Sequence, residues 1–217
     1  MKKVFLSLGV VSLLAVQSHA QALFFDSFDT ETQGLGRLSL TNWTITNPGV
    51  NLANVDVIGS IPSAFFDVYA GQGHGNYVDL DGTGTTVSTV LTNNTAFALV
   101  GGTKYTFVFD LGKNGSAAES MTARVFDATT LTPFTLTPTG AIAGTGAIPS
   151  FTQQVFTFTP SVTTTGKISF TQNNPADSNG YIIDNVALGI IPEPTTLALA
   201  LAMGLPFVIV SRRRRNG

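Results

Sequence analysis

The 217-residue sequence contains no cysteine, one tryptophan and two histidines, and charged residues make up only 11% of it. Without cysteine the chain has no disulfide and no thiolate chemistry, so its folded part depends on its hydrophobic core alone. One of the two histidines, His19, belongs to an N-terminal leader pattern, which leaves His74 as the single histidine of the remaining chain. Metal sites built on pairs of histidines are therefore excluded.

Basic residues are scarce between residues 21 and 191, where five stand against twelve acidic residues, a formal charge of −7. Nucleic acid is excluded as a partner, because phosphate binding needs a basic surface. Catalysis is poorly supported: His74 has no Gly-x-Ser-x-Gly motif with it, and Glu31 and Glu119 are the only glutamates of this stretch. Helical periodicity is also missing, since no pattern with a 3.6-residue period lasts beyond two turns.

Apolar segments lie at both ends of the chain. Residues 1–20 combine a basic start, an apolar run and small residues at positions 18 and 20, which is typical of a signal peptide cleaved before Gln21. Residues 195–211 are uncharged and precede four arginines, which favours a short membrane span with a cytoplasmic Arg-rich tail. We therefore expect one folded domain, residues 21–190, outside the cytoplasm.

The middle of the chain has the two-residue alternation of β-strands. Tyr105, Phe107 and Phe109 share one face of an expected strand, and the other alternating runs lie near residues 121–125, 155–159 and 168–171. Strands at about ten-residue spacing predict an all-β sandwich or barrel. Residues 77–80 read as a strand that ends in a hairpin turn at Asp81-Gly82, and residues 138–149 read as a long loop.

The C-terminal segment, residues 191–217, resembles the PEP-CTERM sorting signal of bacterial exported proteins. The resemblance rests on three parts in a fixed order: the triplet Pro192, Glu193, Pro194, then the apolar run, then Arg212, Arg213, Arg214 and Arg215. It implies processing by an exosortase, a membrane protease-transpeptidase, after signal peptidase has acted at the other end. The protein would first be anchored in the inner membrane and then reach the cell surface or the exterior. A plain stop-transfer anchor is the alternative.

A second resemblance, to the galactose-binding-like jelly roll of carbohydrate-binding modules and cell-wall proteins, covers most of residues 22–190. Its elements in order are residues 25–29, Trp43, and residues 75–82, 102–107 and 180–186. It implies a single jelly-roll β-sandwich with Trp43 in the core. It also implies a structural Ca²⁺, the only cofactor expected, held by oxygen ligands that include Asp29, Asp184 and, more weakly, Asp26. The alternative is that these carboxylates end strands and face water.

The densest group of aromatic and polar residues lies between positions 65 and 77. Sugar sites combine aromatic platforms with amide and carboxylate side chains, so this group predicts a ligand-binding site. Its members are Phe66, Tyr69, His74, Asn76 and Tyr77. Structural packing of the same residues is the alternative.

These observations together predict an exported, non-catalytic protein of the bacterial surface or extracellular matrix, associated with exopolysaccharide. A carbohydrate-binding module with a defined sugar site is the alternative, and a secreted hydrolase is the third reading. The module predicts saturable sugar binding that Tyr69→Ala or Tyr77→Ala weakens, whereas a matrix protein predicts self-association or covalent linkage. The hydrolase predicts turnover that His74→Ala abolishes.

Overall fold

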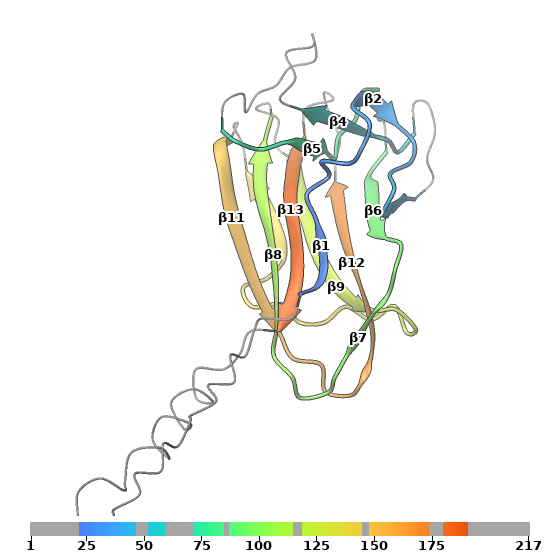
Figure 1. Cartoon of the computed structure of the whole chain (residues 1–217), viewed down its shortest axis with the longest axis vertical. Helices are drawn as coiled ribbons and strands as arrows, with labels where there is room; N and C mark the ends of the chain where they lie inside the picture. The colour runs from blue at the N-terminus through green and yellow to red at the C-terminus, as the bar shows by residue number, and fades with distance from the viewer. Residues whose placement is uncertain are drawn as a thin grey trace, which may run out of the picture. The chain divides into compact units, whose positions relative to one another are not determined.

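The protein is an antiparallel jelly-roll β-sandwich, as the sequence predicts (Figure 1). The computed structural model describes residues 22–46, 52–59, 72–84, 87–114, 119–144, 148–173 and 180–190. Within these ranges every regular element is a strand, and no helix is long and apolar enough to cross a membrane. The expected signal peptide and the sorting segment lie outside the described residues.

One sheet has seven strands and is built around the C-terminal strand β13. Its main path runs in the order β11 (Ile148–Phe158), β8 (Tyr105–Lys113), β13 (Tyr181–Ile190), β5 (Asn76–Asp79), β4 (Val55–Gly59) and β2 (Gly34–Arg37). The first strand, β1 (Ala22–Asp26), pairs with β13 along its second half, while β5 pairs with the first half. In Figure 1, β11, β8, β13 and β1 consequently stand side by side.

The second sheet has six strands and repeats this arrangement around β12. Its path is β10 (Ala141–Gly144), β9 (Glu119–Asp127), β12 (Thr164–Asn173), β6 (Thr89–Asn93) and β3 (Trp43–Ile45). A short strand, β7 (Phe97–Leu99), shares one edge of β12 with β6.

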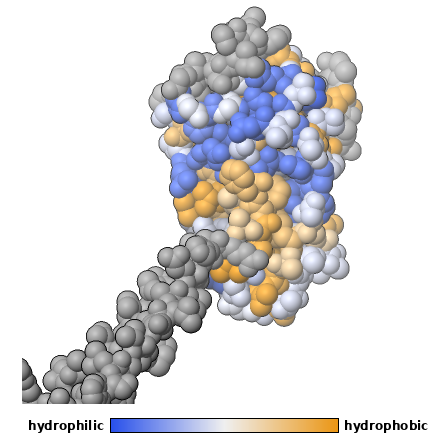
Figure 2. Space-filling model, viewed as in Figure 1, coloured by the Kyte–Doolittle hydropathy of each residue, from blue (hydrophilic) through white to orange (hydrophobic). Residues whose placement is uncertain are grey.

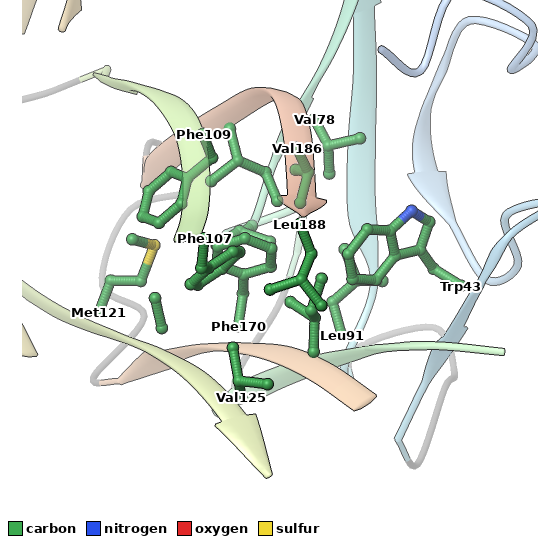
Figure 3. Packing of buried hydrophobic residues seen from close by; sticks show 14 of the residues in the cluster. Trp43, Val78, Leu91, Phe107, Phe109, Met121, Val125, Phe170, Val186 and Leu188 are labelled. Atoms are coloured by element: carbon green, nitrogen blue, oxygen red, sulfur yellow. The ribbon is translucent and has the colours of Figure 1, made fainter. Parts of the chain in front are cut away.

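The core between the sheets is rich in aromatic rings (Figure 3). Phe170 of β12 lies at its centre, with ring centroids 4.9 Å from Phe109, 5.9 Å from Phe107 and 5.8 Å from Trp43. Burying each such side chain contributes about 1.5–3 kcal/mol, and in a chain without cysteine this burial is the main stabilising term. Trp43 is 1% exposed, so its expected place in the core is confirmed.

The alternating runs of the sequence are confirmed as strands, but two predicted connections are wrong. The turn at Asp81-Gly82 is not a hairpin, because the next strand, β6, joins the other sheet. Asp79 Oδ1 accepts hydrogen bonds from the backbone N–H groups of Asp81 and Gly180, which fixes the chain where it leaves the sheet. Residues 138–149 are not one loop, since they contain β10, which pairs with β9, and the start of β11.

Candidate ligand-binding face

The seven-stranded sheet has an outer face that carries the polar and aromatic residues of interest. Along β8 the side chains of Phe107, Phe109 and Leu111 enter the core, so Val108 and Asp110 point outward. On β13, Ile183 and Val186 enter the core and Asp184 points outward. Asp184 and Asp110 are direct partners in the β13–β8 ladder, which brings two carboxylates together on one face.

Four side chains form a polar network on this face: His74, Asp110, Asp184 and Asn185. His74 Nδ1 lies 2.6 Å from Asp184 Oδ2. Asn185 Nδ2 donates to Asp110 Oδ2 at 2.9 Å and to Asp184 Oδ2 at 3.2 Å. One amide therefore bridges the two carboxylates, and His74, from the segment before β5, closes the network from the side.

A β-bulge in β13 gives the network its shape. The β13–β8 register shifts between Asp184 and Ala187, and Asn185 has a φ of 48°. Asparagine tolerates this left-handed conformation better than most residues, and bulges re-aim side chains where they occur. The backbone N–H of Asn185 also donates to Asp184 Oδ1 at 2.7 Å, so the bulge orients both residues at once.

Burial governs the protonation of Asp184, whose residue is only 1% exposed. Desolvation raises the pKa of Asp184 to about 6, and repulsion from Asp110 adds to the rise. Hydrogen bonds from His74 and from the Asn185 N–H act in the opposite direction. Asp110, by contrast, is only partly buried and lies at the open side of the network.

Aromatic rings flank the network on the side of β5 and β11. The rings of His74 and Phe151 lie 4.0 Å apart, and Tyr77 meets Phe151 edge-on at 5.6 Å. Tyr77, Ile58 and Ile182 form a small buried apolar cluster on this outer face, with Phe151 packed against it. His74 and Phe151 are partly exposed, whereas Tyr77 is buried.

An apolar row crosses the same face on the other side of the network. It consists of Phe25 on β1, Ala187 on β13, Val108 on β8 and Val155 on β11. Phe25 is 61% exposed and Val155 is 46% exposed. Figure 2, viewed as in Figure 1, shows an apolar patch on this face below a hydrophilic band.

The structure brings together only part of the site predicted from sequence. His74 belongs to the polar network, and Tyr77 contacts it through Phe151. Asn76 points elsewhere: its side chain donates to the backbone oxygen of Glu31 and accepts from Gln33. Two further predicted members, Phe66 and Tyr69, lie outside the described residues.

The three predicted calcium ligands each have other partners. Asp26 accepts hydrogen bonds from Trp43 Nε1 and the Phe28 N–H, and Asp29 accepts from Ser27 and the Asn76 N–H. Asp184 belongs to the polar network. Among the described residues no group of three or more His, Asp or Glu side chains is arranged to hold a metal. Calcium binding by this domain therefore stays a prediction.

Three residues of the site were missed by sequence reasoning: Asp110, Phe151 and Asn185. Asp110 gives a weak signal, as a charged residue at an outward position of a strand whose other outward residues are Thr106 and Val108. Asn185 follows Asp184 directly, but its bulge leaves no mark in the sequence pattern. Phe151 lies between the predicted loop, residues 138–149, and the alternating run at residues 155–159, so no pattern singles it out.

Comparisons with known proteins identify the fold. No protein-family model matches the chain, and no curated protein matches its sequence. A similar solved structure is the K1 cleaved adhesin domain of Lys-gingipain from Porphyromonas gingivalis W83, with a TM-score of 0.51 and 14% identity, covering 78% of this chain and 98% of that chain.

Two carbohydrate-binding modules are also similar, at lower scores. One is TmCBM61 in complex with β-1,4-galactotriose, with a TM-score of 0.46 and 17% identity over 76% of this chain and 94% of that one. The other is a module of Cellvibrio mixtus lichenase 5A in complex with cellotriose, with a TM-score of 0.43 and 12% identity over 79% of this chain and 100% of that one. Identities this low concern the fold alone, and the likeness to the adhesin domain agrees with the jelly-roll sandwich described above.

Proposed function

We propose that this domain binds a glycan on the outer face of its seven-stranded sheet. The observation that carries the proposal is the polar network of His74, Asp110, Asp184 and Asn185 beside the exposed apolar row. Sugars present hydroxyl groups at their edges and apolar C–H faces, and sites that bind them combine polar groups with aromatic or apolar surface. This favours the carbohydrate-binding module over the purely structural matrix protein among the readings of the sequence.

Asp110 is the residue we expect to contact the ligand most directly. Its carboxylate is partly exposed, and Asn185 holds its Oδ2 in place. Further lone pairs of that carboxylate accept hydrogen bonds from sugar hydroxyls. Asp184 and the bulge orient Asn185, so they position the site rather than contact the sugar.

We also propose that the chain is exported and sorted to the cell surface or the exterior. The sequence supports this with its signal-peptide pattern and its PEP-CTERM-like tail, and signal peptidase and an exosortase are the implied partners. Mass spectrometry of the protein from the host tests it: the mature chain is expected to begin at Gln21 and to end near Pro192. A chain that retains residues 1–20 or ends at Gly217 contradicts the corresponding half of the proposal.

The test of binding is calorimetric titration of residues 21–191 with the host's extracellular polysaccharide, in calcium and again in EDTA. Saturable heat is expected for the wild type, and Asp110→Ala is expected to weaken binding at least tenfold. Asp127→Ala is the matched control, because it removes one carboxylate at the end of β9, in the other sheet. If the wild type binds in calcium but not in EDTA, glycan binding requires calcium.

The same samples decide between binding and turnover. No reducing sugar is expected to appear after prolonged incubation, because the proposal assigns no proton-transfer role to His74 or to either carboxylate. Sugar release that His74→Ala abolishes favours the hydrolase instead. Absence of saturable heat in both buffers overturns the glycan-binding proposal.

A further inference from the structure

We propose that the ligand is an uncharged glycan chain that lies across the strands, along the apolar row, and that polyanionic glycans are rejected. This inference rests on the proposed function and specifies its ligand class and orientation. It is argued from the register of four strands and from the charges beside them.

The apolar row is continuous in one direction only. Phe25 pairs with Ala187, Ala187 with Val108, and Val108 with Val155, so the four side chains form one line perpendicular to the strands. Along β8, by contrast, the outward residues change from Thr106 to Val108 to Asp110, and apolar contact stops after one side chain. An extended ligand gains continuous apolar contact only by crossing the strands.

The row has a length suited to a short run of sugar rings. Neighbouring strands are about 4.8 Å apart, so the line from β1 to β11 spans about 14 Å. Phe25, the single aromatic ring of the row, stands at one end and Val155 stands at the other. This surface offers a ring to stack on at one end and aliphatic contact along the rest.

A polar row runs parallel to the apolar row, two residues farther along β8 and therefore about 7 Å away. It is formed by Asp184, Asp110 and Gln153, which are successive partners across β13, β8 and β11, together with Asn185. A glycan seated on the apolar row would turn one edge, with its hydroxyl groups, toward Asp110, Gln153 and Asn185, whereas Asp184 is buried and orients Asn185. The two rows thus match the two kinds of surface that a sugar chain presents.

The charges of this face determine which glycans fit. Asp110 and Asp184 are both acids, and His74, the basic partner on this face, is already hydrogen-bonded to Asp184. The only lysine or arginine on β1, β8, β11 or β13 is Lys113, which is buried among core residues. Uronic-acid or sulfated chains would therefore be repelled by these carboxylates, and the four strands that carry the rows place no lysine or arginine on the outer face to offset the repulsion.

The experiment uses the full chain in a sugar-free detergent, applied to an array of uncharged and anionic oligosaccharides. Binding is expected to uncharged members, with at least tenfold weaker binding to uronic-acid and sulfated members. The best uncharged oligosaccharide is then titrated by calorimetry against variants whose circular dichroism matches the wild type.

Two variants test the row, and a third serves as a control. Phe25→Ala and Val155→Asp are expected to weaken binding at least tenfold. Val162→Asp adds the same charge at another exposed valine, in the turn before β12, and is expected to bind as the wild type does.

Each outcome separates the two proposals. If no oligosaccharide binds the wild type, the proposed function fails and this inference fails with it. If Asp110→Ala loses binding while Phe25→Ala and Val155→Asp keep it, glycan binding stands and the apolar row is not its site. If anionic oligosaccharides bind as tightly as uncharged ones, the assigned ligand class is wrong.

Discussion

Asp26 and Trp43 make a buried hydrogen bond that ties the first strand to the core. Trp43 Nε1 donates to Asp26 Oδ2 at 2.8 Å, and both residues are buried. Trp43→Phe removes the donor and leaves a buried carboxylate oxygen with only the longer bond from Asn42, at 3.2 Å. We expect a loss of about 1–3 kcal/mol in the free energy of unfolding, measured by urea denaturation.

The contribution of this bond is isolated by a double-mutant cycle with Asp26→Asn. Because the two residues are in direct contact, their effects should not be additive, and an interaction energy of about 0.5–3 kcal/mol is expected. Unchanged urea midpoints for Trp43→Phe would show that the bond contributes nothing to stability.

Asp184 predicts a pH dependence of stability with a definite sign. Because the pKa of Asp184 is raised to about 6 in the folded state, from an ordinary value of 3.8, the native state binds more protons than the unfolded state between these values. The free energy of unfolding should therefore fall as pH rises from about 4 to 6. Burial raises the pKa of Asp79 as well, so ionisation of Asp79 also lowers the free energy of unfolding as pH rises.

Urea midpoints measured from pH 4 to 7 test this prediction. Asp184→Asn removes the titrating group and keeps a similar shape, so its midpoint should vary less with pH than that of the wild type. Asp127→Asn serves as a contrast. Hydrogen bonds, above all the one from Thr164, lower the pKa of Asp127 to about 2. Titration of Asp127 therefore changes stability only below pH 4, and its removal should leave the profile from pH 4 to 7 unchanged in shape. Identical profiles for wild type and Asp184→Asn contradict the assignment.

At the scale of elements, the bulge in β13 is held by a residue with positive φ. Asn185→Gly keeps this backbone conformation accessible but removes the amide that bridges the two carboxylates. Asn185→Val loses the same hydrogen bonds and also places a β-branched side chain where φ is 48°, at a cost of about 1–2 kcal/mol. The valine variant is therefore expected to be less stable than the glycine variant by about that amount.

Urea denaturation measures this difference, and calorimetry with the glycan gives an independent readout. Both substitutions should weaken binding, because both lose the Asn185 amide. If the two variants are equally stable, the positive φ at residue 185 does not disfavour a β-branched side chain. If both variants bind as the wild type does, Asn185 does not orient the site.

The strands were readable from the sequence because each sheet buries one face, which forces apolar residues to alternate along β8, β9 and β12. The connections were less readable. A turn signal such as Asp81-Gly82 shows that the chain turns but does not show which sheet it enters next. Residues 141–144 contain a single large apolar side chain, Ile142, among alanine and glycine, which is too little alternation to indicate the strand β10.

The candidate site was less predictable than the fold, for a physical reason. Asp110 and Asp184 are 74 positions apart, and only the register of β8 with β13 makes them neighbours. The alternation of residues 105–111 places Asp110 opposite the aromatic residues, but it contains no information about which strand, and which residue of it, lies beside Asp110. His74 is recognisable in the sequence as the single histidine of the domain. Its partner, Asp184, is not, because only the tertiary fold brings these two residues together.

At the scale of the whole molecule, the two ends of the domain meet in one ladder. Ala22 pairs with Gly189, so the start of the first strand and the end of the last strand lie side by side. Residues Gln21–Ile191 form a compact unit of their own, and its apolar core draws its members from within those bounds. A chain cleaved before Gln21 retains all of β1.

The last prediction follows from this closure of the sheet by β1. A chain that begins at Ser27 lacks β1, so it loses the ladder with β13, the Asp26–Trp43 bond and the packing of Phe24 against Trp43 at 5.4 Å. We expect the free energy of unfolding to fall by about 3–5 kcal/mol, which corresponds to a fall of about 10 °C in Tm for a domain of this size.

Differential scanning calorimetry compares chains 21–191 and 27–191, with 21–190 as the control, which ends at the last residue of β13. We expect 21–190 to match 21–191, because the described core ends within β13, whereas 27–191 should unfold at lower temperature and less cooperatively. Since β1 also carries Phe25, the shortened chain should lose glycan binding even below its Tm. Equal Tm values for 27–191 and 21–191 would show that β1 is dispensable, and signal-peptide cleavage would then tolerate a shift of several residues without harm to the fold.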